Sequence, residues 1–586
     1  PPSQFYQNPI WDNYEYYSKY FRRITTMTTD STHVADVALL YPMESLWADY
    51  ATGTTEKFPW NINNDFSYIT DKLLRINIDY DIMGQDIFED CRITDGRLVV
   101  RNEEYSLLLI PPMTTIRDKV AKKIIEFIRK GGKVLCLSLL PYKNNEGKSL
   151  KQLNSFFAKE FGIKEDELIS NYKDGKESAE IVESKNFNGS NLSLIKGGPL
   201  YKSDSIDLIE KSIVKMIDRD IDITFLNDTK GNVYYSHWRK DGKEIYFVIN
   251  SDEKAYDLDI SFRNVGKPYI WNPETGEIKP LHVYRLDNGR LIVQYNPREL
   301  ETNFIILENE PLGEGITKTN LEVIEIENKN NIKTVSLLKR NEEDNYLDII
   351  KEGKTKHIKI DISGDKVKKL KNSWVINRKD PNVLVINNWK MTQGFSEGAG
   401  WFNMLGGTVF VESNFYIEGY GSKIKAVFDR VPEPNEIELN GKVITNFKKS
   451  SYLDHQMEEV DIKDLVKIGN NKIRIKFELK ERAFQGKTGI DPIEIMYDPV
   501  LIIGDFKLIS DNTQDNDYII GKEEGEIRTG SWTEQGYPYF KGCIELSQNV
   551  YIEEDLLRDK KVYLKGDGIK EIAELYINGD KVGLRP

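Results

Sequence analysis

Carboxylates and one cysteine are the side chains in this sequence that could act directly on a substrate. Hydrolysis of a glycosidic bond needs two carboxylic acids about 5–10 Å apart, and 94 acidic residues are too many for the sequence to single out a pair. Glu44 is the best-placed single carboxylate, because it follows the first strand of a predicted α/β segment, where such sheets bind ligands. A structural role is the more common alternative for a lone acid at that position.

Cys136 is the obvious candidate nucleophile, because it lies on a predicted strand after the Gly131-Gly132 turn. A nucleophile elbow requires a strained turn from strand to helix with small neighbours. Since Leu135 and Leu137 flank the cysteine, we expect a buried structural thiol. The three cysteines show no CxxC spacing and the five histidines no HExxH spacing, so neither a disulfide framework nor a zinc site is predicted.

Tryptophans are the candidate sugar-binding residues, because an aromatic ring can stack on the apolar face of a pyranose. Trp47 and Trp60 fall in the loop predicted between the first strand and first helix, and Trp401 falls in a glycine-rich stretch. The alternatives are core packing for the first two and an ordinary surface loop for the third. No GxGxxG or GxxxxGK[ST] sequence is present, so no phosphate-binding loop is predicted.

The elements that would position these residues begin with an amphipathic helix over 10–29. From Val34 onward, continuous apolar strands alternate with helices, which predicts a parallel sheet covered on both faces. Asp65 is expected to cap the first of these helices. We place the α/β domain at 34–225.

Beyond residue 226 the pattern becomes β-rich, and Asp241-Gly242 predicts a hairpin. Two stretches then recur: EIELNGKV at 436–443 resembles AELYINGDKV at 573–582, and NFYIEG at 414–419 resembles NVYIEE at 549–554. They predict two homologous sandwiches, the second of which lacks its closing strands. The predicted segments are a β-sandwich at 226–312, a bridging β segment at 313–371, and sandwiches at 372–510 and 511–586.

Length and composition limit the class of protein. The 586 residues suffice for about three to five domains, and 39% hydrophobic and 11% aromatic residues exclude a disordered chain. A net charge of −13 makes nucleic acid an unexpected partner, and no apolar run approaches the ~20 residues that span a membrane. The chain opens Pro1-Pro2-Ser3 without Met, which we interpret as an internal fragment; a processed mature enzyme is the alternative.

Several stretches resemble glycoside hydrolase family 106, the α-L-rhamnosidases. PPSQFYQNPIW at 1–11 and HVADVALLYPMESLWADY at 33–50 resemble the segment leaving the catalytic barrel of that family. EIYFVINS at 244–251 and GKPYIWNPETGEI at 266–278 are similar to the sandwich that follows it. VDIKDLVKIGNNKIRIKF at 460–477 is similar to the galactose-binding-like domains of many glycosidases.

This resemblance implies a multidomain α/β plus all-β chain. Residues 1–33 would end an upstream (β/α)8 barrel, 34–225 would be an amidotransferase-like domain that is catalytically dead, and 372–510 and 511–586 would be galactose-binding-like jelly rolls. The acid and base would precede Pro1, so no catalytic residue is implied here. No cofactor is implied either, although calcium could be held by the longer protein. The implied substrate-binding residues are Gln4, Tyr6, Trp47, Trp60 and Trp401.

The leading hypothesis is therefore a non-catalytic, C-terminal portion of a bacterial glycoside hydrolase that removes terminal α-L-rhamnosyl groups from oligo- or polysaccharides. A β-galactosidase-like fragment and a non-catalytic carbohydrate-binding or scaffold protein are the alternatives. Neither a cytoplasmic nor a secreted location is predicted, and the oligomeric state is left open. The sequence before Pro1 would separate the hypotheses, because an enzyme requires a barrel there and a binding protein would have a Met start nearby.

Overall fold

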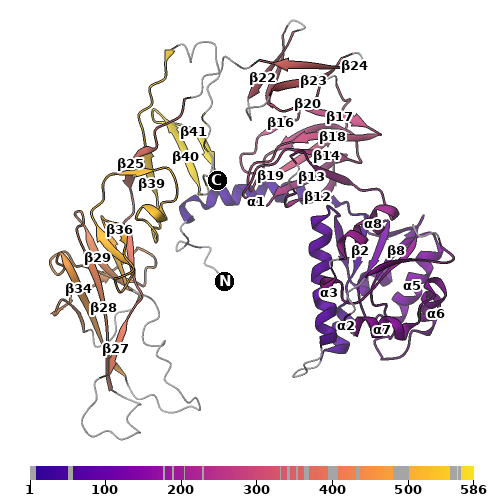
Figure 1. The fold of residues 1–586 in the computed structure, drawn as a ribbon, viewed down its shortest axis with the longest axis horizontal. Helices are drawn as coiled ribbons and strands as arrows, with labels where there is room; N and C mark the ends of the chain where they lie inside the picture. The colour runs from indigo at the N-terminus through magenta and orange to yellow at the C-terminus, as the bar shows by residue number, and fades with distance from the viewer. Residues whose placement is uncertain are drawn as a thin grey trace. The chain divides into compact units, whose positions relative to one another are not determined.

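The fold is known from a computed structural model of the chain (Figure 1). The chain forms two compact units: the first unit comprises residues 16–365, and the second unit comprises residues 366–585 together with 1–15. The structure describes residues 5, 8, 10–50, 57–173, 175, 179–187, 191–203, 205–227, 230–313, 315–329, 332–338, 344–351, 354–361, 368–393, 407–429, 436–479, 500–554, 564, 566, 569 and 571–585.

The α/β domain of the first unit is built on a six-stranded sheet of order β3-β2-β7-β8-β10-β9. Five strands are parallel, and only β9 at the edge runs antiparallel to its neighbour β10. This confirms the predicted parallel sheet. The strands are β2 (Val37–Leu40), β3 (Tyr80–Met83), β7 (Leu107–Ile110), β8 (Lys133–Leu137), β9 (Glu180–Glu183) and β10 (Leu192–Lys196). A small meander joins β4 (Arg92–Thr94), β5 (Arg97–Val100) and β6 (Glu103–Tyr105).

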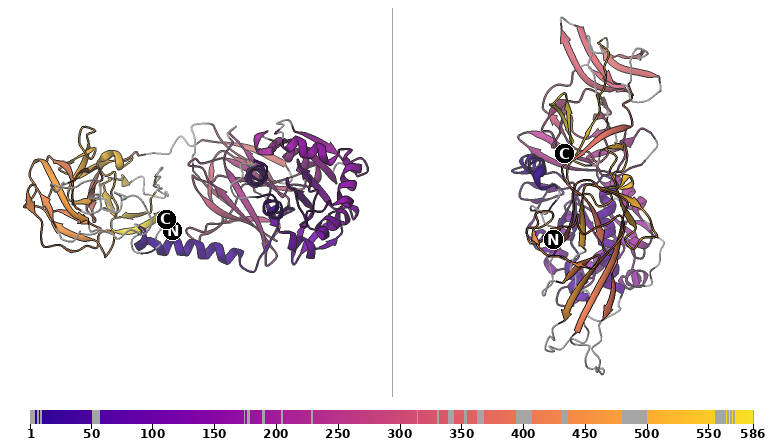
Figure 2. Two further views of the ribbon diagram at one scale, coloured as in Figure 1. Left: turned by 90° about the horizontal axis from the view of Figure 1, so that it is seen from below. Right: turned by 90° about the vertical axis from the view of Figure 1, so that its left-hand side faces the viewer.

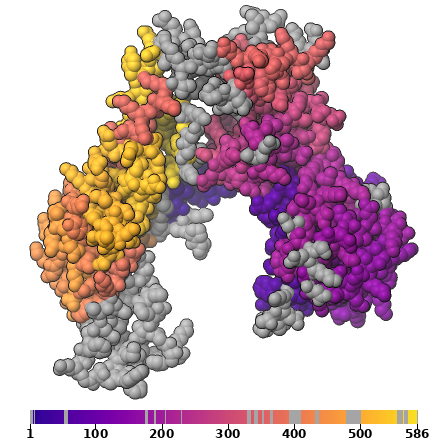
Figure 3. Space-filling model, viewed as in Figure 1, coloured from indigo at the N-terminus to yellow at the C-terminus, as the bar shows by residue number. Residues whose placement is uncertain are grey.

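Helices cover both faces of this sheet, because successive residues of each strand face opposite ways. Leu108 and Ile110 share a core cluster with the apolar residues of α5 and α6, whereas Leu107 and Leu109 share one with those of α3 and α8. The space-filling view shows the resulting surface in purple (Figure 3). The helices are α2 (Met43–Asp49), α3 (Lys57–Arg75), α4 (Gln85–Asp90), α5 (Asp118–Arg129), α6 (Lys151–Phe161), α7 (Glu165–Lys173) and α8 (Ile206–Met216).

The predicted cap at Asp65 is wrong, because α3 begins earlier, at Lys57, and Asp65 lies inside the helix. Its fully buried carboxylate accepts hydrogen bonds from the Tyr172 hydroxyl at 2.8 Å and the Tyr201 backbone N–H at 2.9 Å. Burial outweighs these bonds and raises the pKa of Asp65 to about 7. The acid therefore connects α3 to two distant segments, which sequence alone cannot reveal.

Two antiparallel sheets follow, of order β1-β12-β13-β19-β15-β16 and β11-β14-β18-β17, and residues of both share one hydrophobic core; we call this pair of sheets the sandwich. The predicted hairpin at Asp241-Gly242 is confirmed, since both residues have positive φ (50° and 73°) between β12 and β13. The strands are β1 (Thr32–His33), β11 (Ile221–Phe225), β12 (Val233–Lys240), β13 (Lys243–Asn250), β14 (Leu258–Phe262), β15 (Lys267–Trp271), β16 (Ile278–Pro280), β17 (Tyr284–Asp287), β18 (Arg290–Tyr295) and β19 (Thr302–Glu308).

The predicted first helix is α1 (Tyr14–Thr28), preceded by a 3₁₀ turn at Trp11–Asn13. Its second half packs on the sandwich, where Ile24 and Met27 join the cluster formed by Ile245, Phe304 and Ile306. After the sandwich come two small sheets, formed by β20 (Ile316–Thr319), β23 (Asn345–Lys351) and β24 (Lys354–Ile360), and by β21 (Glu322–Lys329) with β22 (Ile332–Leu338).

The second unit is built mainly of strands (Figure 2). One sheet has the order β26-β35-β29-β33-β32 and the other β31-β30-β34-β28-β37-β36, with β27 also paired to β28. Its strands are β26 (Asn382–Ile386), β27 (Lys390–Gln393), β28 (Gly407–Ile417), β29 (Ile424–Phe428), β30 (Ile437–Leu439), β31 (Lys442–Val443), β32 (Lys448–Lys449), β33 (Glu458–Asp461), β34 (Gly469–Leu479), β35 (Val500–Gly504), β36 (Lys507–Ser510) and β37 (Tyr518–Gly521).

The remaining strands form two smaller sheets. One joins β25 (Ser373–Arg378) to β38 (Glu526–Arg528) and β39 (Ile544–Ser547), and the other is the hairpin of β40 (Ala573–Ile577) and β41 (Asp580–Arg585). Both repeated Asn-Gly pairs are hairpin turns with positive φ, 53° and 79° at Asn440-Gly441 and 53° and 93° at Asn578-Gly579. The second repeated stretch differs, because 549–554 lie outside every strand. The structure thus confirms a multidomain chain of α/β and β parts.

Candidate functional site

The carboxyl edge of the parallel sheet is where an α/β domain of this kind binds ligands. Helix α2 follows β2 at this edge, and its first turn carries Glu44. The Glu44 carboxylate lies 3.0 Å from the Arg117 guanidinium and accepts a 2.8 Å hydrogen bond from the Gln85 amide. The acid predicted as the best-placed catalytic candidate is therefore held as an ion pair that ties α2 to neighbouring segments.

Asp49, at the other end of α2, is held in the same way. Its carboxylate lies 2.5 Å from the Lys143 ammonium and accepts a hydrogen bond from the Thr114 hydroxyl. Between the two acids, the buried Ser45 hydroxyl accepts the backbone N–H groups of Thr114 and Thr115, each at 3.0 Å. Helix α2 is consequently fixed along its length by polar contacts on its inner side.

The outer side of α2 carries aromatic rings. Trp47 is 72% exposed and Tyr50, directly after the helix, is 58% exposed; Trp60, on the adjoining helix α3, is 56% exposed. Both tryptophans thus lie on helices rather than in the predicted loop, and neither packs in the core. We call Trp47, Tyr50 and Trp60 the aromatic surface.

The inner side of the same helices explains this exposure. Leu46 of α2 and Phe58 of α3 pack on a buried cluster of Ile62, Leu139 and Tyr172. The Phe58 and Tyr172 rings meet edge to face with centroids 5.4 Å apart. Since these neighbours occupy the inner positions, Trp47 and Trp60 are turned to the surface. The other predicted sugar-binding residues, Gln4, Tyr6 and Trp401, lie outside the described residues.

Cys136 is fully buried on β8, and burial alone raises the pKa of its thiol well above the ordinary range. A protonated, inaccessible thiol is not a nucleophile, so the expected structural role fits.

Sequence reasoning missed Ser138, which follows β8 with a positive φ of 52°; no helix follows it directly, so the turn is not a nucleophile elbow. Its buried hydroxyl is directed at the carbonyls of Gly197 and Gly198, each at 2.8 Å, so it joins two strand ends. No flanking glycine marked this turn in the sequence.

Two histidines were also missed because the sequence scatters them, and the first, His33, links the sandwich to the α/β domain. His33 on β1 lies between Asp79 and Asp81, with ring nitrogens 2.9 and 3.1 Å from their carboxylates. Burial would lower the pKa of His33, but the two acids outweigh it and raise the pKa to about 10.

The fully buried His237 lies 2.9 Å from Asp220 and 2.8 Å from Glu244. Its pKa is also raised, since the two acids outweigh the effect of burial. His33 and His237 of the first unit thus each lie between two carboxylates.

In the part of the chain that the structure describes, no three His, Cys, Asp or Glu side chains are grouped as metal ligands. No described helix is both long enough and apolar enough to cross a bilayer.

The site is thus the carboxyl edge of an α/β domain, where the acids Glu44 and Asp49 are engaged in ion pairs. Residues 3–286 match the family model of the alpha-L-rhamnosidases, glycoside hydrolase family 106. The resemblance noted in the sequence is confirmed.

The relatives are distant and longer. A protein of Formosa agariphila named "Putative beta-glucuronidase" is 21% identical over 280 residues, which are 47% of this chain and 19% of that protein. The structure of a rhamnosidase from Novosphingobium sp. PP1Y is 15% identical, with a TM-score of 0.33, over 83% of this chain and 41% of that one.

A β-galactosidase from Bacillus circulans sp. alkalophilus is 13% identical, with a TM-score of 0.30, over 50% of this chain and 44% of that one. The chain therefore spans less than half the length of each of these relatives.

Proposed function

We propose that this chain is the non-catalytic, C-terminal part of a glycoside hydrolase whose complete protein removes terminal α-L-rhamnosyl groups from polysaccharides. The observation that carries the proposal is the family match over residues 3–286, which includes the whole α/β domain. In the same proposal the α/β domain is amidotransferase-like and the sandwiches of the second unit are galactose-binding-like.

The chemistry of the carboxyl edge supports the non-catalytic part of this proposal. A glycosidase needs one carboxyl group that donates a proton and a second that acts as nucleophile or base. Glu44 and Asp49 are each paired with a cation, Arg117 and Lys143, and each also accepts a further hydrogen bond. Both carboxylates thus hold α2 in place, and the acid and base are proposed to lie elsewhere in the complete protein.

The aromatic surface is proposed to contact the polysaccharide. Large exposed rings on a rigid scaffold are typical of sugar-binding sites, because they stack on apolar sugar faces with little loss of side-chain entropy. Helix α2 provides such a scaffold, since it is anchored through Glu44, Ser45 and Asp49.

The complete natural protein tests the proposed substrate. We expect it to hydrolyse an aryl α-L-rhamnoside with a higher kcat/KM than an aryl β-galactoside or an aryl β-glucuronide. Preference for either of the other two glycosides would refute the rhamnosyl assignment while leaving the class of enzyme intact.

A further inference from the structure

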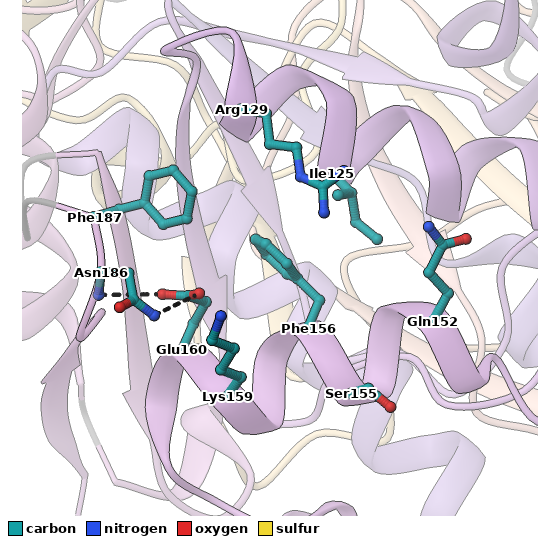
Figure 4. A pocket seen from close by; sticks show the side chains of 9 residues that line it. All are labelled: Ile125, Arg129, Gln152, Ser155, Phe156, Lys159, Glu160, Asn186 and Phe187. Carbon is teal, nitrogen blue, oxygen red and sulfur yellow. Dashed lines mark hydrogen bonds between the residues drawn. The ribbon is translucent and has the colours of Figure 1, made fainter.

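A second surface of the α/β domain, away from α2, is hollowed into a pocket of ≈ 540 Å³ (Figure 4). One wall is the last turn of α5, another is α6, and the third is the segment that follows β9. The size lies within the range of pockets that hold small molecules.

Two phenylalanine rings supply an apolar lining. Phe156 projects from α6 and Phe187 from the segment after β9, with centroids 6.1 Å apart and planes tilted by 52°. Both rings are only partly buried, and both pack against the core below the helices. They therefore keep some ring surface available within the pocket.

Two cations lie at the same pocket. Figure 4 shows the Arg129 guanidinium and the Lys159 ammonium turned toward the space beside Phe156. Neither Arg129 nor Lys159 forms an ion pair among the described residues, although acidic residues outnumber basic ones in the chain by 94 to 81. Exposed, unpaired cations beside aromatic rings attract a ligand that combines an apolar face with a negative charge.

The one acid that lines the pocket is already engaged. Glu160 is 3% exposed, and its carboxylate accepts the Asn186 side-chain amide at 2.9 Å and the Ser184 hydroxyl at 2.7 Å. It thereby fixes the segment that carries Phe187. Burial raises the pKa of Glu160, but the hydrogen bonds and the nearby Lys159 charge outweigh it and lower the pKa, so the carboxylate stays ionised and offsets one of the two positive charges of Arg129 and Lys159. The pocket is thus preorganised on its aromatic side.

We propose that this pocket binds an anionic sugar, a pyranose carrying a carboxylate or a sulfate. The Phe156 and Phe187 rings would contact the apolar face of the sugar, and Arg129 and Lys159 would bind the anionic group. The inference goes beyond the proposed function, since it concerns a site that cleaves no bond and does not depend on the rhamnosyl assignment.

Calorimetry with the intact chain tests the site, using D-glucuronate, D-glucose 6-sulfate and neutral D-glucose as probes. We expect at least one of the two anionic sugars to bind at least about 10-fold more tightly than glucose, since a charge-assisted hydrogen bond contributes at least that factor. Arg129→Gln and Lys159→Gln should each weaken that binding by about 10-fold. Lys122→Gln, which removes an exposed cation of α5 outside the pocket, should leave it unchanged.

Phe187→Leu separates a sugar site from a simple anion site. It should weaken the binding of the anionic sugar but not that of acetate or inorganic sulfate, and melting temperatures will show whether the variants are folded. The proposal is refuted if neither anionic sugar binds saturably, if acetate or sulfate binds as tightly as the sugars, or if the Arg129 and Lys159 variants bind like the wild type. Tighter binding of an acidic peptide such as oligoglutamate would also refute it.

Discussion

Raising the pH from 6 to 10 should destabilise the first unit through His33. The ring lies between Asp79 and Asp81 and is 12% exposed, and its pKa is raised from 6.5 to about 10. Because the folded-state pKa lies above the unfolded one, the stabilisation is fully present below pH 6.5 and is lost as the pH rises through about 10. At about 1.4 kcal/mol per pKa unit, the whole effect is at most about 5 kcal/mol.

The assay is thermal unfolding of the chain at several pH values between 6 and 10, compared with His33→Gln. The melting temperature of the variant should lie several degrees below that of the wild type at pH 6, and the difference should shrink steadily toward pH 10. His357→Gln is the matched control, because that ring is 55% exposed beside Asp348 and exposed pairs contribute little. A wild-type-minus-His33→Gln difference that stays constant across this range would refute the reasoning.

Three further outcomes are expected. Trp47→Ala and Trp60→Ala in the complete protein should raise KM while lowering the melting temperature by no more than about 1–2 °C. The control Phe58→Ala, on the inner side of α3, should lower the melting temperature by several degrees. An unchanged KM in both tryptophan variants would contradict the proposed sugar contact. A thiol reagent should label the exposed Cys543 rapidly in the native chain and the two buried cysteines only on unfolding, and rapid labelling of two or more thiols would contradict the buried positions. Backbone amides of the β40–β41 hairpin should exchange with solvent faster than those of the β30–β31 hairpin. The described strands of the first hairpin pair only with each other, whereas the second hairpin joins a larger sheet. Equal protection of the two hairpins would show that further contacts cover the first.

Local patterns predicted much of the fold. The four apolar residues of β7 predicted a strand buried on both faces, and Asp241-Gly242 predicted a hairpin, because each depends on neighbouring residues alone. The start of α3 could not be predicted from Asp65, since that carboxylate is satisfied by Tyr172 and Tyr201, far away in the sequence.

Long-range pairing was also beyond local patterns. Strand β1 precedes the α/β domain yet pairs with β12 of the sandwich, and β37, beyond the boundary proposed at 510, pairs with β28. Strand pairing of this kind depends on the whole sheet, so the segment boundaries from sequence remain predictions.

The candidate site was predictable in its residue types but not in its geometry. The sequence identified Glu44, Trp47 and Trp60, but not that Arg117 neutralises the acid or that both tryptophans lie on helices with exposed rings. Partners such as Arg117 are distant in sequence, and a tryptophan next to a core residue such as Leu46 can face either way until the helix is placed.

The most direct test of the central claim is the activity of this chain alone on an aryl α-L-rhamnoside. The account predicts no turnover above a buffer blank at any concentration of the purified chain, because the proposed acid and base lie outside it. Turnover that increases in proportion to the concentration of the chain and persists through repeated purification would contradict the account.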